Sequence, residues 1–155
     1  MLDTIKLSQQ AKDQLVKLKR VTGIAQWNVL CRWGFCMSLS EPGVPPGVRI
    51  PADSNVEMTW RVFSGRHADL YAALLKMRMA QDGLPIDSDT VAQQFRLHLH
   101  RGISYLAGDR SLKRIDDLIA LAVPSEPAGE GEPPDADHAL VAHADGTSSP
   151  TAHAD

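Results

Sequence analysis

The sequence has little cysteine and no long apolar segment, and both shortages exclude whole classes of protein. Only two of the 155 residues are cysteines, which excludes a small secreted fold held together by several disulfides. No apolar run approaches the roughly 18 residues that span a bilayer, and the N-terminus lacks the basic-then-apolar order of a secretory signal. We therefore expect a cytoplasmic protein that does not enter a membrane.

The sequence motifs of the common enzyme classes are also missing. There is no GxSxG, HExxH, P-loop or GxGxxG pattern. His98 and His100 would point about 200° apart on a helix, so they do not share a metal ion. The adjacent pair Asp116 and Asp117 diverges as well. We predict no catalytic residue, no metal site and no cofactor.

The two cysteines do not form a CxxC motif. Cys31 and Cys36 are separated by about 140° around a helix, and we expect both to be free, buried thiols. A sulfur-relay enzyme that uses one of them is a minor alternative. It would need an exposed thiol whose pKa is lowered by a positive neighbour such as Arg32.

Lysine and arginine are absent from residues 124–155, so the charge is segregated along the chain. Residues 1–123 hold all 16 basic residues and 12 acids, a net charge of +4, while residues 124–155 hold seven acids, a net charge of −7. Residues 1–36 alone carry six bases and two acids. A surface that binds a polyanion should therefore be built from the N-terminal elements.

The same composition divides the chain into two parts. Residues 1–123 have the apolar periodicity of one compact domain. Residues 124–155 contain five prolines and no aromatic residue, so they cannot bury enough apolar surface to offset their ordering entropy. We predict a folded domain at 1–123 and a disordered acidic tail, rich in Pro, Ala and Asp, at 124–155.

Apolar spacing and capping residues predict a mainly α-helical domain. Residues 4–7 alternate as a short extended segment, Ser8 caps a helix at 9–22, and Gly23 ends it in the left-handed conformation. Further helices are expected at 26–39, 65–81, 90–106 and 112–122, with a loop at 42–47 and an extended segment at 55–63. The inward positions that we expect are Ala11, Leu15, Leu18 and Val21; Leu70, Tyr71, Leu74 and Met77; Val91, Phe95, Leu99, Ile103 and Leu106; and Leu112, Ile115, Leu118, Ile119 and Ala122.

The helix predicted at 26–39 is apolar almost all the way round. A domain of about 120 residues rarely surrounds one helix completely, so we infer that this helix also forms part of a subunit interface. Its one polar strip is Asn28 and Arg32. These two residues either satisfy a buried acid or present donors to a phosphate.

The helix predicted at 9–22 has a basic side opposite its apolar side. Lys12, Lys17, Lys19 and Arg20 spread over it. Such side chains neutralise phosphates without any geometry that reads bases. A solvated helix face is the alternative interpretation.

Residues 5–39, IKLSQQAKDQLVKLKRVTGIAQWNVLCRWGFCMSL, resemble the DndE family, a component of the bacterial DNA phosphorothioation system. The resemblance lies in the KLS lead-in, the Lys-rich helix that ends in VTGI, and the pattern WNVLCRW-F---SL. Residues up to 123 agree with the family in the length and order of their helices.

The resemblance implies an accessory, non-catalytic protein that works with the other Dnd components when sulfur replaces a non-bridging phosphate oxygen of DNA. It implies a helical homo-oligomer, with a tetramer as one expected size. It also implies contact with the DNA backbone, in intact or nicked duplexes, through surface lysines. Carried to this sequence, and with Arg32 added from its place on the polar strip, the expected DNA-binding residues are Lys6, Lys12, Lys17, Lys19, Arg20 and Arg32.

A ribbon-helix-helix transcriptional regulator is the alternative from another class. An N-terminal strand followed by two helices suits that fold, in which strands of two subunits pair and enter the major groove. It would require Thr4 and Lys6 to face bases.

Overall fold

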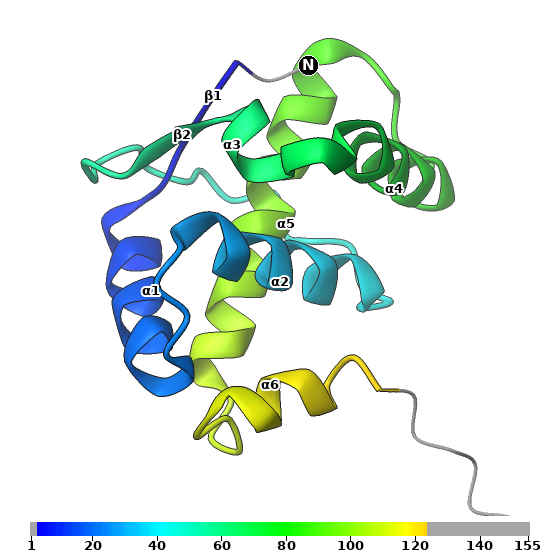
Figure 1. Cartoon of the computed structure of the whole chain (residues 1–155). Helices are drawn as coiled ribbons and strands as arrows, with labels where there is room; N and C mark the ends of the chain where they lie inside the picture. Colours follow the sequence, from blue (N-terminus) through cyan, green and yellow to red (C-terminus); the bar gives the residue numbers. More distant parts are fainter. Residues whose placement is uncertain (1–2, 124–155) are drawn as a thin grey trace, which may run out of the picture. The chain divides into compact units, whose positions relative to one another are not determined.

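The computed structural model describes residues 3–123, which form a mainly α-helical fold around one long helix, α5 (Figure 1). In chain order the elements are β1 (Thr4–Lys6), α1 (Gln9–Thr22), α2 (Trp27–Ser40), β2 (Glu57–Thr59), α3 (Trp60–Ser64), the 3₁₀ turn η1 (Gly65–His67), α4 (Ala68–Gln81), α5 (Ser88–Gly108) and α6 (Ile115–Ala120). This is the predicted fold class. The acidic segment 124–155, predicted to be disordered, lies outside the described residues. Within residues 3–123, no helix combines the length and the apolar character needed to cross a membrane.

Helix α1 begins and ends at the predicted residues. The Ser8 hydroxyl accepts a hydrogen bond from the Ala11 amide at 3.1 Å, which caps the N-terminus. Gly23 has a φ of 73°, the left-handed conformation that ends the helix with little strain because glycine has no Cβ. Ala11, Leu15 and Leu18 are buried as predicted, but Thr22 takes the last inward position in place of Val21.

The strand β1 pairs with β2 of the same chain. The pairing is antiparallel, with Thr4 opposite Thr59, Ile5 opposite Met58, and Lys6 opposite Glu57. A ribbon-helix-helix dimer would instead pair β1 with the same strand of a second subunit. The ribbon-helix-helix interpretation is therefore not confirmed.

The extended segment predicted at 55–63 is only partly extended. Its last residues form helix α3, because the Thr59 hydroxyl caps the Val62 amide at 3.2 Å. The turn brings the rings of Trp60 and Phe63 onto Phe95 of α5, with centroid distances of 5.5 and 5.0 Å. Aromatic packing outweighs the strand preference of these residue types.

Helices α2 and α5 cross with their backbones in contact at two glycines. A Cβ built on Gly102 would lie 1.6 Å from the carbonyl oxygen of Gly34, and one built on Gly34 would lie 2.8 Å from the amide nitrogen of Ile103. Neither helix has room for any side chain at the crossing. The crossing places α5 at the centre of the fold, where all of its predicted inward residues are buried.

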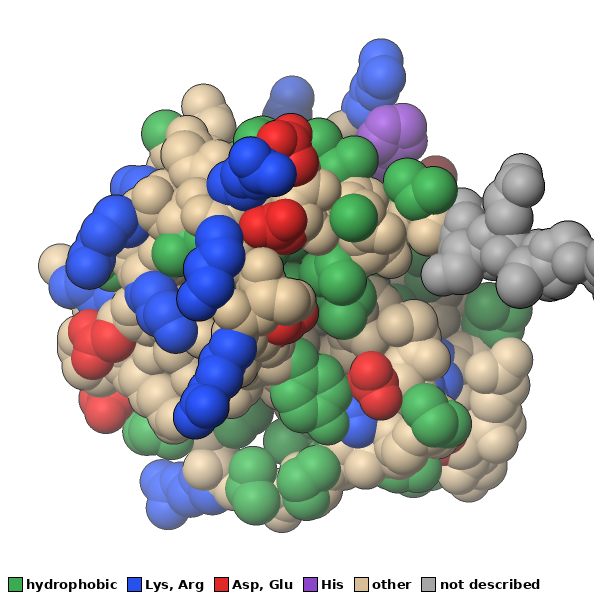
Figure 2. Space-filling model, turned by 90° about the horizontal axis from the view of Figure 1, so that it is seen from below, with side chains coloured by type: hydrophobic (Ala, Val, Ile, Leu, Met, Phe, Trp, Pro, Cys, Tyr) green, Lys and Arg blue, Asp and Glu red, His purple; other side chains and the backbone are tan. Residues whose placement is uncertain are grey.

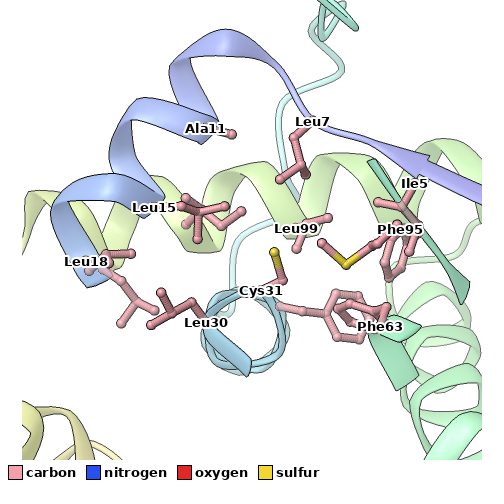
Figure 3. Packing of buried hydrophobic residues seen from close by; sticks show 14 of the residues in the cluster. Ile5, Leu7, Ala11, Leu15, Leu18, Leu30, Cys31, Phe63, Phe95 and Leu99 are labelled. Carbon is pink, nitrogen blue, oxygen red and sulfur yellow. The ribbon is translucent and has the colours of Figure 1, made fainter. Parts of the chain in front are cut away.

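The core fills both sides of this crossing. In Figure 3, Leu15 and Leu18 of α1 point toward Leu30 of α2, while Leu99 of α5 lies close by. Toward the sheet, the rings of Phe35 and Phe95 lie 5.1 Å apart, at a tilted angle. The core therefore joins α1, α2 and α5 to the sheet.

Helix α4 is rotated from the orientation predicted for it. Leu70 and Met77, expected inward, are 54% and 55% exposed. The buried residues are instead Leu75, Arg78 and Met79. Apolar residues occur on every side of α4, so their spacing does not select one face. The contacts of Arg78 decide the rotation.

Arg78 is a buried arginine that binds the chain where α2 ends. Its guanidinium donates to the carbonyl oxygen of Leu39 at 2.8 Å, to that of Gly43 at 2.9 Å, and to that of Glu41. Asp82 accepts from its Nε at 2.9 Å. These bonds satisfy carbonyl groups that the end of a helix leaves without partners.

Helix α6 is shorter than predicted, and its N-cap is Arg114 rather than Ser111. The Ser111 hydroxyl donates to Asp109, while the carboxylate of Asp117 accepts from the amides of residues 113 and 114. The helix consequently begins at Ile115. Ile115, Ile119 and Ala122, expected inward, are exposed, whereas Leu112 and Leu118 are buried as predicted.

Ser38 and His98 form a buried polar pair near the C-terminal end of α2, where Arg78 also binds. The Ser38 hydroxyl accepts from Arg101 Nε at 2.7 Å and lies 3.0 Å from His98 Nδ1. Its own hydrogen is therefore free for Nδ1, which favours the neutral imidazole. Burial, together with the charges of Arg101 and Arg78, lowers the pKa of His98 to about 4.

Replacement of Gly102 by alanine should destabilise the fold by about 3 kcal/mol, because the new methyl group meets backbone atoms that no rotamer change can move. Urea unfolding followed by circular dichroism measures the loss. Gly108→Ala is the matched control, since no atom lies within 4 Å of its Cβ position. Equal stability of Gly102→Ala and the wild type would contradict the backbone contact.

Stability should decrease as the pH falls from about 6.5 toward 4, because the unfolded chain takes up a proton at His98 before the folded chain does. The contribution of His98 over this window is about 3 kcal/mol. Chemical unfolding at a series of pH values should show a flatter profile for His98→Gln. Exposed His67→Gln should keep the wild-type profile. Parallel profiles for the wild type and His98→Gln would show that His98 does not titrate in this way.

Candidate nucleic-acid interface

Basic side chains gather on one side of the molecule. Figure 2 shows Lys and Arg concentrated at the left of the view from below, the side on which Figure 1 places α1. Acidic side chains lie among them but are fewer. The lysines predicted to contact DNA come largely from α1, so the position of each on that helix decides what the surface can hold.

Helix α1 distributes its basic residues around its outer half. Because Leu15 and Leu18 face the core, the helical spacing puts Lys12 and Lys19 on one flank and Lys17 on the other. Exposed Arg20 lies between the two flanks. The basic side is thus wider than a single strip.

The lysine ammonium groups on one flank rest against polar and aromatic neighbours. Lys12 Nζ donates to Asn55 Oδ1 at 2.8 Å, and Lys19 Nζ lies 4.7 Å from the centre of the Trp27 ring. On the sheet, Lys6 pairs with Glu57 at 3.8 Å, and both side chains are mostly exposed. Each ammonium has three donors, so these contacts leave capacity for a phosphate.

The other flank is tied to the end of α5. Lys17 Nζ donates to the carbonyl oxygen of Ala107 at 2.6 Å. The chain then turns through residues 109–114 into α6, which packs against α1. This connection carries three exposed basic residues, Arg110, Lys113 and Arg114. Sequence reasoning missed them because residues 37–123 balance ten bases with ten acids.

Arg32 does not join the lysines of α1. It is half-buried, and its Nε donates to the Asn28 carbonyl at 3.2 Å, while the Asn28 amide donates to the Val62 carbonyl. Its guanidinium lies near Gly65, the residue that follows α3 in the chain. No ion pair within residues 3–123 includes Arg32, so a buried acid as its partner is not observed there.

The outward side of α2 remains apolar and uncovered by the described residues. Val29 and Trp33 are half-buried, and Cys36 is exposed. Together with Arg32 and Tyr71 they line a shallow depression of about 500 Å³. Residues 3–123 bury mainly the side of α2 that faces α5, so they do not surround this helix, in agreement with the expectation that one domain cannot do so.

The two cysteines have different surroundings. Cys31 is buried as predicted, whereas Cys36, also expected to be buried, is exposed. Burial raises the pKa of the Cys31 thiol to about 12, and desolvation raises the pKa of Cys36; nearby Arg32 opposes both shifts but is weaker. A sulfur relay needs a lowered thiol pKa, and neither cysteine has one.

Residues 4–114 match the family model described as DNA sulphur modification protein DndE. The chain belongs to the DndE family. The resemblance of residues 5–39 is thereby confirmed and extends over most of the helices. None of the curated proteins compared matches the chain.

Two solved structures are similar to this DndE family member. One is DndE from Escherichia coli B7A, described as involved in DNA phosphorothioation modification. It is 27% identical with a TM-score of 0.57, over 68% of this chain and 98% of that chain. The other, a DndE mutant with lysines in place of two glycines, is 21% identical with a TM-score of 0.55, over 70% and 100% of the two chains. The second shows a shared fold.

Proposed function

We propose that this chain is a DNA-binding accessory component of the DNA phosphorothioation machinery that works with the other Dnd proteins. The observation that carries the proposal is the basic side of the molecule, built by α1 and by residues 109–114. Membership in the DndE family supplies the reaction in which such a surface would be used.

The dimensions of α1 suit the DNA backbone. Its 14 residues make a helix about 21 Å long. A duplex carries about one phosphate charge per 1.7 Å of axis, so α1 spans many phosphates. With Lys12 and Lys19 on one flank and Lys17 on the other, the helix can reach phosphates on both of its sides. Such contacts set position and orientation without sequence preference.

Core packing fixes the position of the helix that carries these lysines. The apolar side of α1 is held by Leu15 and Leu18, and both ends of the helix are capped. Lysines on a fixed helix lose less freedom on binding than lysines on a mobile loop. The connection 109–114 adds charge at the C-terminal end of α1, which would lengthen the phosphate-binding surface.

The outward side of α2 supports a homo-oligomer as the working form. Val29, Trp33 and Cys36 leave an apolar strip on a helix whose opposite side is in the core. A second copy can cover the strip through a symmetric contact, in which the same patch serves both subunits. A dimer made in this way is a natural unit for the expected tetramer.

Salt-dependent DNA binding tests the proposed function. Neutralising Lys12, Lys17 and Lys19 to glutamine should reduce the slope of log affinity against log salt by about 0.9 for each lost phosphate contact on duplex DNA. Fluorescence anisotropy on intact and nicked duplexes measures the slope. Lys76→Gln, at an exposed position on α4, is the control and should keep the wild-type slope. Absence of binding by the wild type would mean that the protein acts through other Dnd subunits.

The oligomer is tested by light scattering at micromolar concentration. The wild type should exceed the mass of one chain, and Trp33→Glu should shift it toward the monomer, because a buried unpaired carboxylate opposes the contact. Met77→Glu adds the same charge on the exposed side of α4 and should leave the mass unchanged. A wild-type monomer would refute the interface on α2.

A further inference from the structure

A cavity of about 340 Å³ lies beside the basic side of α1, between that helix, α5 and residues 45–51. Gln10 and Gln14 of α1 line it, and Lys17 follows on the same strip of the helix, at the i, i+4, i+7 spacing. Leu97 and Tyr105 of α5 line the second wall. The cavity thus opens one helical turn from a predicted phosphate contact.

The third wall of the cavity, residues 45–51, is fixed by hydrogen bonds from α5. Arg101 Nη1 donates to the Gly43 carbonyl at 2.7 Å, and Arg96 Nη2 donates to the Ile50 carbonyl at 3.2 Å. His100 Nε2 accepts from the Ser8 amide at 3.1 Å, which joins α5 to the start of α1. Prolines further restrict the segment that carries this wall. Preformed walls are typical of small-molecule sites.

The lining combines apolar and polar side chains. Seven of its residues are proline or aliphatic, seven are polar or charged, and the last is Tyr105, which is 44% exposed. The amide of Gln14 makes only a long contact of 3.4 Å with Ser104 Oγ, so it can turn toward another partner. Arg49 is exposed and in no ion pair within residues 3–123.

We propose that this cavity holds one unstacked nucleobase of the DNA that the basic side of α1 binds. A base has two apolar faces and a hydrogen-bonding edge, which match the aliphatic and aromatic part of the lining and the amide and hydroxyl of Gln14 and Ser104, whose mutual contact is long. The cavity volume is at the small end of the range for ligand sites and suits a single base. The inference rests on the proposed function, because the backbone contacts deliver the base.

Charge near the opening agrees with this ligand. Lys17 lies three residues beyond Gln14, about 4.5 Å along the helix axis, so it can hold the phosphate next to an inserted base. Arg49 can bind the phosphate on the other side. Because unstacking costs least where a base is already unpaired, the protein should prefer DNA with an unpaired base to a fully paired duplex.

The experiment compares two duplexes that differ in one position, bound by the full-length protein. One carries a single unpaired 2-aminopurine, and the other pairs the same base. The unpaired duplex should bind about tenfold more tightly, and the fluorescence of its 2-aminopurine should change on binding. Gln14→Ala and Tyr105→Ala should each lower this preference severalfold, with paired-duplex affinity changed less than twofold. Gln81→Ala, an exposed glutamine on α4, should keep the full preference.

Thermal unfolding checks that each variant is folded; neither Gln14 nor Tyr105 belongs to the buried core, so their replacement leaves the core in place. Equal affinity of the wild type for the two duplexes would overturn the cavity proposal and leave backbone binding intact. A preference that survives both substitutions would also overturn it. Binding of the unpaired duplex alone would support the cavity but contradict the proposed backbone contacts.

Discussion

The backbone contact between Gly34 and Gly102 is the constraint on which the rest of the fold depends. The axes of packed helices are usually about 8–10 Å apart, because side chains separate the backbones. Here no side chain fits between them, since a Cβ on Gly102 would lie 1.6 Å from the Gly34 carbonyl oxygen. The two helices therefore lie in direct backbone contact. Their side chains on either side of the crossing pack against one another, and side chains of α1 and α3 complete the core.

The arginines at the end of α2 connect this core to the surface. Arg78 and Arg101 both bind the carbonyl oxygen of Gly43, one from α4 and the other from α5. They orient α4, hold the start of the proline-containing loop and so shape one wall of the cavity. The buried charge of Arg78 is tolerated there because carbonyl oxygens and Asp82 satisfy its donors.

The proposed contacts are divided between different elements. The basic side is made by α1 and residues 109–114, while the apolar strip of Val29, Trp33 and Cys36 belongs to α2. DNA and a second subunit could then be held at the same time. The cavity lies where α1 meets α5, on the flank that carries Lys17, so backbone and base contacts would act on one strand.

The helical class, the bounds of α1, the inward side of α5 and the family could all be predicted from residue patterns alone. These features depend on the spacing of apolar residues and on caps such as Ser8 and Gly23, which act within one helix and need no contact from elsewhere in the chain. Long-range packing set the rotation of α4, the helical turn at Trp60, the place of Arg32 and the contact of α6 with α1. Each depends on partners far along the chain: Arg78 must reach carbonyls near residue 40, and Lys17 must meet the end of α5. Local periodicity contains no information about such contacts, because packing selects among faces that the sequence leaves equally apolar.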